Sequence, residues 1–286
     1  VGIIIFILNV KKGKKFFNKE FWKYALGFNI PLLAYYLSQV IFNQSDRIMI
    51  SHITSTSDAA MYGVAYNLAM ILTFVLNAIN GSYVPWLYGK IKKNNAQDNK
   101  SISLILIMLM GLIILCVIWY APEIILIMAG KQYSVAIYVV APVSMSLLLL
   151  FYSQLFINIE FYYEEKKMLV YGSIGAAVLN IILNGLLIPI FGFVAAGYTT
   201  LISYIVFALS NYYTMRLMLK KRKLDDDMYD YKLLLLLFVA FMISGFLGVS
   251  LYGNLILRIL ITLVVFGLLV INKNKFIDAL KKIKER

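Results

Sequence analysis

Long apolar blocks, separated by short polar gaps, recur along this chain and limit what it can fold into. A helix that crosses a bilayer needs about 17–25 mostly apolar residues. Eight stretches meet that requirement, at about residues 24–48, 60–88, 101–120, 134–158, 168–188, 194–216, 233–250 and 254–272. Only 14% of the residues are charged, against about 25% in soluble domains. The pattern therefore predicts an all-α fold, a polytopic bundle of about eight membrane-spanning helices.

A ninth apolar block, residues 1–10, is too short to span a membrane. The sequence opens inside this block and has no initiator Met. We therefore expect residues 1–10 to be the remnant of a preceding transmembrane helix in a longer protein.

The basic residues alternate along the chain in a way that predicts its orientation. Of the 27 Lys and Arg residues, 24 fall in alternate gaps or in the tail, on one predicted side of the membrane. By the positive-inside rule that side is cytoplasmic. We expect a multi-pass plasma-membrane protein whose C-terminus faces the cytoplasm, with membrane lipids rather than nucleic acid as partners of the excess charge.

Polar side chains follow one arc of the helical wheel in five of the eight predicted helices, whereas the other three are almost purely apolar. We take the following as candidate cavity or substrate-binding residues: Gln39, Asn43, Asp46, Arg47, Tyr66, Asn77, Asn80, Asn158, Asn180 and Asn184. Any single Asn can instead be a hydrogen-bonding link between helices, worth about 0.6 kcal/mol. Five whole stripes favour a solvated cavity and hence a transporter.

The adjacent Asp46 and Arg47 are the sharpest local feature, because opposite charges at membrane depth are costly and usually functional. A structural role, by pairing with neighbours or reaching the outer interface, stays open. Glu160 is expected in a solvated loop beside Lys166 and Lys167, with a part in an inner gate as the alternative. Arg258 is expected to be an interfacial anchor of the last helix.

Signatures of catalysis are missing from the sequence. It contains no phosphate-cradling loop, zinc signature or nucleophile elbow, and a single His and a single Cys leave few groups for acid–base or thiol chemistry. We predict no catalytic residues, no metal site and no enzyme activity.

Several segments resemble the oligosaccharide (Wzx-type) flippases of the MATE-like MOP superfamily. Residues 46–50 (DRIMI) and 59–69 (AAMYGVAYNLA) resemble the seventh and eighth helices of that family. Residues 179–184 (LNIILN), with Ile188-Pro189, Gly192, Ala195-Ala196-Gly197 and Thr199-Thr200, resemble its eleventh and twelfth helices. Together with the turn at residues 128–133 (MAGKQY), the resemblance covers most of residues 24–220.

The resemblance implies a division of the chain. Residues 11–220 would form the C-terminal transmembrane lobe of six helices, and residues 221–286 two additional helices and a basic cytoplasmic tail. The missing N-terminal lobe of the same protein would be a partner and would hold most of the pyrophosphate site, because the spans here offer only Arg47 and Arg258 as cations.

The resemblance also implies an activity, the flipping of a polyprenyl-pyrophosphate-linked oligosaccharide repeat unit by alternating access. This would serve capsule, exopolysaccharide or O-antigen synthesis, with polysaccharide polymerase machinery as a further partner. No cofactor is expected other than a proton or Na⁺ as coupling ion. Two alternatives stay open: a cation-coupled multidrug exporter of the same superfamily, and a membrane glycosyltransferase or glycan polymerase.

Overall fold

The computed structural model describes residues 2–13, 17–165, 167–224, 227–271 and 277, and within these ranges every regular element is a helix. The α-helices are α1 (Gly2–Gly13), α2 (Lys19–Ile53), α3 (Thr56–Lys92), α4 (Asn99–Trp119), α5 (Ala121–Met128), α6 (Ile137–Tyr162), α7 (Lys167–Phe191), α8 (Val194–Lys221), α9 (Tyr231–Ser250) and α10 (Leu255–Ile271). Short 3₁₀ helices, η1 (Ala96–Asp98) and η2 (Lys131–Ala136), join α3 to α4 and α5 to α6.

Local sequence signals explain where several helices begin. The Asn18 side chain accepts hydrogen bonds from the backbone N–H groups of Glu20 and Phe21 at the start of α2. Ser55 caps α3 and Asp230 caps α9 in the same manner. These side chains satisfy N–H groups that have no partner within the helix. Between α7 and α8, Gly192 adopts a φ of 70°, which glycine reaches without steric cost.

Six helices in the described residues are long and apolar enough to cross a membrane: α3, α4 with η1, α6 with η2, and α7, α8 and α9. The other two predicted spans are α2, which is a continuous helix, and α10, whose described apolar part is shorter. The prediction of an all-α polytopic bundle is confirmed. The division of the chain after residues 10 and 220 stays a prediction.

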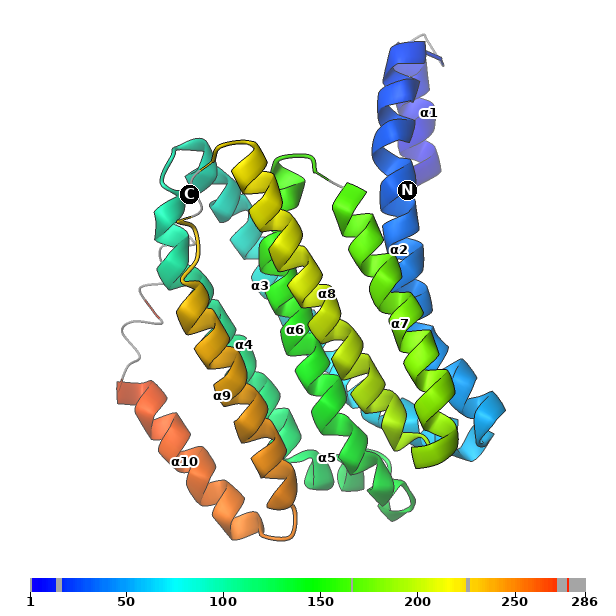
Figure 1. Ribbon diagram of the computed structural model, residues 1–286, viewed down its shortest axis with the longest axis vertical. Helices are drawn as coiled ribbons and strands as arrows, with labels where there is room; N and C mark the ends of the chain where they lie inside the picture. The colour runs from blue at the N-terminus through cyan, green and yellow to red at the C-terminus, as the bar shows by residue number, and fades with distance from the viewer. Residues whose placement is uncertain (1, 14–16, 166, 225–226, 272–276, 278–286) are drawn as a thin grey trace.

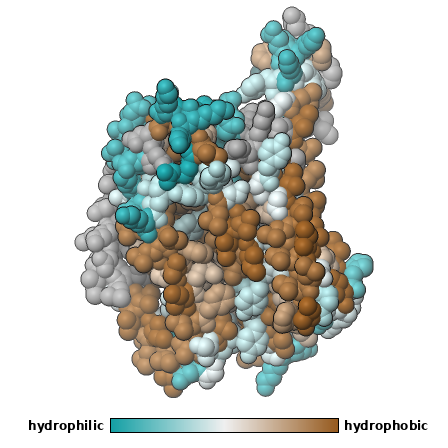
Figure 2. Space-filling view, viewed as in Figure 1, coloured by the Kyte–Doolittle hydropathy of each residue, from teal (hydrophilic) through white to brown (hydrophobic). Residues whose placement is uncertain are grey.

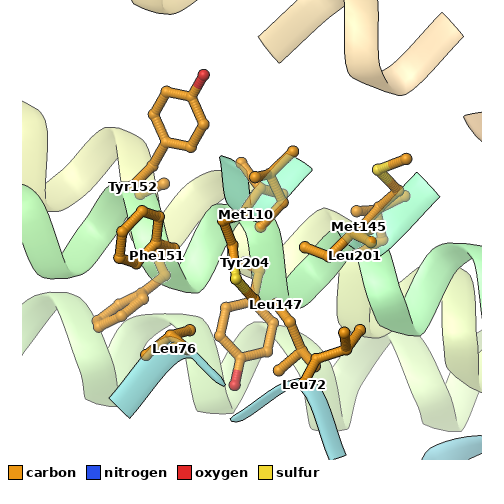
Figure 3. Packing of buried hydrophobic residues seen from close by; sticks show 14 of the residues in the cluster. Leu72, Leu76, Met110, Met145, Leu147, Phe151, Tyr152, Leu201 and Tyr204 are labelled. Carbon is orange, nitrogen blue, oxygen red and sulfur yellow. The ribbon is translucent and has the colours of Figure 1, made fainter. Parts of the chain in front are cut away.

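Helix α6 is the centre of the bundle. It packs against α8 and α3 most extensively, and also against α4 and α9, while α2 and α7 pack together at one edge (Figure 1). Figure 3 shows part of the apolar core around α6, to which Leu147 and Phe151 of α6, Leu72 and Leu76 of α3 and Leu201 of α8 all belong. The core thus fixes the positions of α3 and α8, which carry parts of the candidate site.

The lysine-rich gaps gather at one end of the bundle. The C-terminal ends of α1, α3, α6 and α8 all lie toward the upper end in Figure 1, where Figure 2 shows hydrophilic surface above a broad apolar belt. A shared end for these gaps is what the charge pattern predicts. Which membrane face this end meets stays a prediction.

Two charged residues lie elsewhere than expected. Glu160 is not in a solvated loop, because α6 continues to Tyr162 and the Glu160 side chain is 1% exposed. Arg258 does not reach into solvent. It is buried, its Nη1 and Nη2 donate to the Glu123 carboxylate at 2.8 and 2.6 Å, and its Nη1 also donates to the backbone oxygen of Trp119. Arg258 thereby ties α10 to α5 and to the end of α4.

The pH dependence of stability should report on this contact. The Arg258 hydrogen bonds hold the pKa of Glu123 below its ordinary value of 4.5. A carboxyl whose pKa is lowered by folding stabilises the protein above its ordinary pKa and loses that contribution as pH falls through the folded value. We expect the Tm of the purified protein to fall as pH drops below 4.5, and Glu123→Gln to lower the Tm at neutral pH and weaken this acid dependence.

The exposed Glu164 provides a matched control for this measurement. Glu164→Gln should leave both the Tm and its pH profile close to those of the unaltered protein. Equal pH profiles for Glu123→Gln and the unaltered protein would show that the contact with Arg258 does not stabilise the fold.

Candidate functional site

Asp46 lies in the second half of α2, between α3 and α7, and is completely buried. Its placement follows from the helical period, because the face of α2 that carries Ser38, Ser45 and Asp46 turns toward the bundle while Tyr36, Leu37 and Val40 stay exposed. A buried carboxylate needs compensation from hydrogen-bond donors or cations. Asp46 therefore requires such donors or cations from the helices around it.

Three side chains from three other helices donate to the Asp46 carboxylate. The Tyr62 hydroxyl on α3 lies 2.5 Å from Oδ2, the Thr200 hydroxyl on α8 lies 2.7 Å from Oδ2, and the Asn184 Nδ2 on α7 lies 2.6 Å from Oδ1. Hydrogen bonds of this kind favour the charged form of a carboxyl group. Asp46 therefore joins four helices through one carboxyl group.

A second layer of amides and hydroxyls holds these donors in place. The Asn184 Nδ2 also donates to the Asn180 Oδ1 at 3.2 Å, and the Asn180 Nδ2 donates to the Thr200 hydroxyl at 3.2 Å. Ser45 donates to the Asn180 Oδ1, and Thr199 donates to the Asn184 Oδ1. We call this set the Asp46 network: Ser45, Asp46, Tyr62, Asn180, Asn184, Thr199 and Thr200.

Arg47 points away from the Asp46 network and is half-buried. Its Nη2 donates to the Asn67 Oδ1 at 2.6 Å and to the Gly63 backbone oxygen at 3.3 Å, and its guanidinium lies 5.0 Å from the Tyr66 ring centre. The ion pairs found among the described residues include neither Asp46 nor Arg47. The two adjacent charges thus have separate partners, Asp46 inside the bundle and Arg47 nearer its surface, where the Arg47 Nε is buried without a hydrogen-bond partner.

The remaining candidates from the sequence lie in several places. Asn158 on α6 donates to the Asn80 Oδ1 on α3 at 2.8 Å, which is a link between two helices. Asn77 is exposed on α3, and Gln39 is half-buried on α2. The Asn43 side chain lies outside the described residues. The structure therefore brings Asp46, Asn180 and Asn184 together, and Arg47 with Tyr66, but it does not collect all candidates in one pocket.

Five residues of this site were absent from the candidates: Ser45, Tyr62, Asn67, Thr199 and Thr200. Tyr62 and Thr200 do lie on the polar arcs of their helices, so a wheel analysis includes them among polar positions but cannot rank them. Asn67 lies off that arc, and only the approach of α2 to α3 identifies it as a partner of Arg47. No group of three His, Cys, Asp or Glu side chains that could hold a metal occurs in the described part of the chain.

Removing one donor from the Asp46 network should lower stability measurably. Tyr62→Phe deletes the hydroxyl that donates to Asp46 and leaves a buried acceptor less satisfied, a change that costs about 1–3 kcal/mol. Asp46→Leu should cost more, because three buried donors lose their acceptor at once. Thermal unfolding of the purified protein in detergent measures both effects.

Tyr171 on α7 is 74% exposed and serves as a matched control. Tyr171→Phe should leave the unfolding transition unchanged. If Tyr62→Phe unfolds at the same temperature as the Tyr171→Phe protein, the hydrogen bond to Asp46 contributes nothing to the fold.

Sequence comparison relates the chain to proteins of polysaccharide synthesis. A family described as "Polysaccharide biosynthesis protein" matches residues 1–89. "Lsg locus putative protein 1" of Haemophilus influenzae is 27% identical over 167 residues, a match that covers 55% of this chain and 40% of that protein. The chain thus spans less than half of this curated relative.

Two solved structures share the fold. One is an outward-facing multidrug resistance MATE family transporter of the MOP superfamily, with a TM-score of 0.56 and 19% identity. The other is a MOP superfamily transporter from Pyrococcus furiosus, described as having a binding pocket of reverse polarity, with a TM-score of 0.54 and 18% identity. Each match covers 78% of this chain and 52% of the other. The resemblance seen in the sequence is confirmed: the chain has the MATE-like fold of MOP superfamily transporters, and its first 89 residues match the polysaccharide biosynthesis family.

Proposed function

We propose that the chain is part of a flippase that moves a polyprenyl-pyrophosphate-linked oligosaccharide across a bacterial plasma membrane. The observation that carries this proposal is the Arg47 site, where a guanidinium is held beside an aromatic ring and an amide at the edge of a membrane bundle. The match to the polysaccharide biosynthesis family supports the same substrate class.

The Arg47 site fits an anionic, sugar-bearing ligand. Both hydrogen bonds of Arg47 within the described residues use Nη2, which leaves the outer N–H groups of Nη1 for an oxygen anion. The exposed amides of Asn67 and Asn77 on α3 can form hydrogen bonds with sugar hydroxyls. The exposed Tyr36 ring on α2 offers a flat apolar face. The lipid tail can stay against the apolar belt of the bundle, which Figure 2 shows.

A single bundle of this kind is only part of a transport machine. The chain spans 52% of the length of each solved transporter, and alternating access needs two repeats that move against each other around a central site. The second lobe, the rest of the pyrophosphate site and any contact with polymerase machinery belong to this proposal for the whole protein. The chain itself supplies one wall with Arg47 on it.

The Asp46 network is the element at which ion coupling would act. The Asp46 carboxyl group accepts hydrogen bonds from α3, α7 and α8 at once, so a proton or Na⁺ that binds it in place of one of these donors changes how these helices are held. Oxygen atoms of carboxylate, amide and hydroxyl groups suit a hard cation. The oxygen atoms of the Asp46 network are therefore the proposed binding site of the coupling ion.

A cation-coupled multidrug exporter is the second candidate. The buried Asp46 and the fold shared with a multidrug resistance transporter favour it. The family match to residues 1–89 favours the flippase instead. A membrane glycosyltransferase or polymerase has less support, because the fold is that of transporters and the site offers no pair of carboxylates for catalysis.

Deletion of the gene distinguishes the two transport functions. A strain that lacks the complete protein should lose surface polysaccharide and accumulate finished lipid-linked repeat units in its inner membrane. Normal surface glycan together with raised sensitivity to cationic drugs would contradict the flippase and support the exporter.

Substitution of Arg47 tests the site itself. Arg47→Gln should lower polysaccharide export at least tenfold, because about 1.4 kcal/mol of lost binding corresponds to a factor of ten. Arg47→Lys keeps the charge but loses the planar arrangement of N–H groups, so we expect only partial rescue. Export is measured as surface glycan per amount of protein in the membrane.

Lys131, in the turn between α5 and α6, offers a control for the loss of one positive charge far from the site. Lys131→Gln should leave export unchanged. Full export by the Arg47→Gln protein would exclude Arg47 as a substrate contact. The coupling ion can be identified in the same cells by collapsing the sodium gradient and the pH gradient one at a time. The gradient whose collapse stops export is that of the coupling ion.

A further inference from the structure

Glu160 is a second buried carboxyl group, and the Asp46 network does not use it. It lies in the last turn of α6, at the lysine-rich end of the bundle, and is 1% exposed. The Thr214 hydroxyl on α8 contacts its Oε1, while its Oε2 is buried without any hydrogen-bond partner. Asp46 accepts hydrogen bonds from three donors, so the two carboxyl groups differ in how many hydrogen-bond partners they have.

Among the described side chains, the groups around Glu160 do not supply a positive charge. Tyr35 on α2 and Glu165, just beyond α6, are the titratable groups that interact with it electrostatically. Arg222, at the end of α8, pairs with Glu165 at 3.8 Å and donates to the Tyr163 backbone oxygen. Within the described residues no ion pair includes Glu160. A bare carboxylate here would be buried, unpaired and close to a second carboxylate.

The contacts of Thr214 are those expected if Glu160 carries a proton. Its hydroxyl lies within hydrogen-bond distance of both the Glu160 Oε1 and the Asn211 backbone oxygen, the latter at 3.1 Å. A hydroxyl has one hydrogen and can donate only once. Both contacts are hydrogen bonds if Glu160 is a carboxylic acid, whose O–H donates to Thr214 while Thr214 donates to Asn211.

Asn211 points to the same conclusion. It is 1% exposed on the face of α8 that carries Thr214, and its Oδ1 is also buried without a partner. Buried acceptors that lack donors are rare and each costs about 1–3 kcal/mol. Two of them on facing helices show that the described side chains of this region offer fewer hydrogen-bond donors than acceptors.

We propose that Glu160 is a proton-binding site of this lobe. In the conformation described here it is a neutral carboxylic acid that joins α6 to α8 through Thr214. When the ends of these helices separate and water enters, the O–H bond of Glu160 breaks and the proton passes to water. The carboxylate then remains hydrated until the helices close and it takes up a proton again.

The site itself does not depend on the flippase proposal, since only its use in transport rests on that function. The test is therefore spectroscopic. Infrared spectra of the complete protein in lipid at neutral pH should contain a carboxylic-acid C=O band that Glu160→Gln removes. Glu164→Gln, which alters an exposed neighbour, should keep the band.

Thr214→Val provides a variant that keeps Glu160 and removes its hydrogen-bond partner. The band should persist in this protein but move to higher frequency, because the C=O and O–H groups lose a hydrogen bond. The Thr214→Val protein also keeps the proposal testable if the Glu160→Gln protein fails to fold. A spectrum without an acid band in the unaltered protein overturns the proposal.

A sodium titration separates a proton site from a metal-cation site. The band should be unchanged by NaCl at constant pH and constant ionic strength. Loss of the band as Na⁺ replaces a larger inert cation would show that the group exchanges its proton for Na⁺, which overturns the assignment to the proton alone. None of these readouts requires transport, so a failed flipping assay and a failed proton site give different results.

Discussion

The need to satisfy one buried carboxylate organises this half of the bundle. An ionised Asp at the centre of a membrane helix costs about 2.5–3.5 kcal/mol on insertion scales, and more if it stays unpaired. Asp46 avoids this cost by accepting hydrogen bonds from α3, α7 and α8. Because each donor belongs to a different helix, the carboxylate sets the relative positions of four helices.

The other half of the bundle is held by different forces. Helix α9 packs on α4 through small residues: a Cβ atom at Gly111 would lie 2.4 Å from the Phe241 ring, and one at Gly248 would lie 2.1 Å from the Trp119 ring. Helix α10 is attached by polar contacts, chiefly the Arg258 ion pair and the hydrogen bond from Tyr120 to Thr262. Helix α9 thus depends on close packing and α10 on polar contacts, whereas α2, α7 and α8 share the Asp46 network.

Glu160 and Asp46 show that the residue type does not decide the chemistry of a membrane carboxyl. Asp46 accepts hydrogen bonds from three donors, whereas Glu160 has a single hydroxyl contact and an unpartnered oxygen, an environment that suits a proton. The two groups lie on neighbouring parts of the same lobe, one between α2 and α7 and one between α6 and α8. A movement that separates α8 from α6 can therefore change Glu160 while the Asp46 network stays closed.

The sequence by itself determined the helices, the shared end of the lysine-rich gaps and the resemblance to MATE-like transporters, because helix length, hydropathy and charge are local properties. It also named Asp46, Asn180 and Asn184 as candidates, because each lies on the polar arc of its own helix. Only the tertiary structure showed that Tyr62 and Thr200 complete their network, that Arg47 binds Asn67, and that Glu160 is buried. Those relations join residues up to 154 positions apart, as between Asp46 and Thr200. Helical periodicity gives the face on which a residue lies, but the partner on that face depends on how the helices pack.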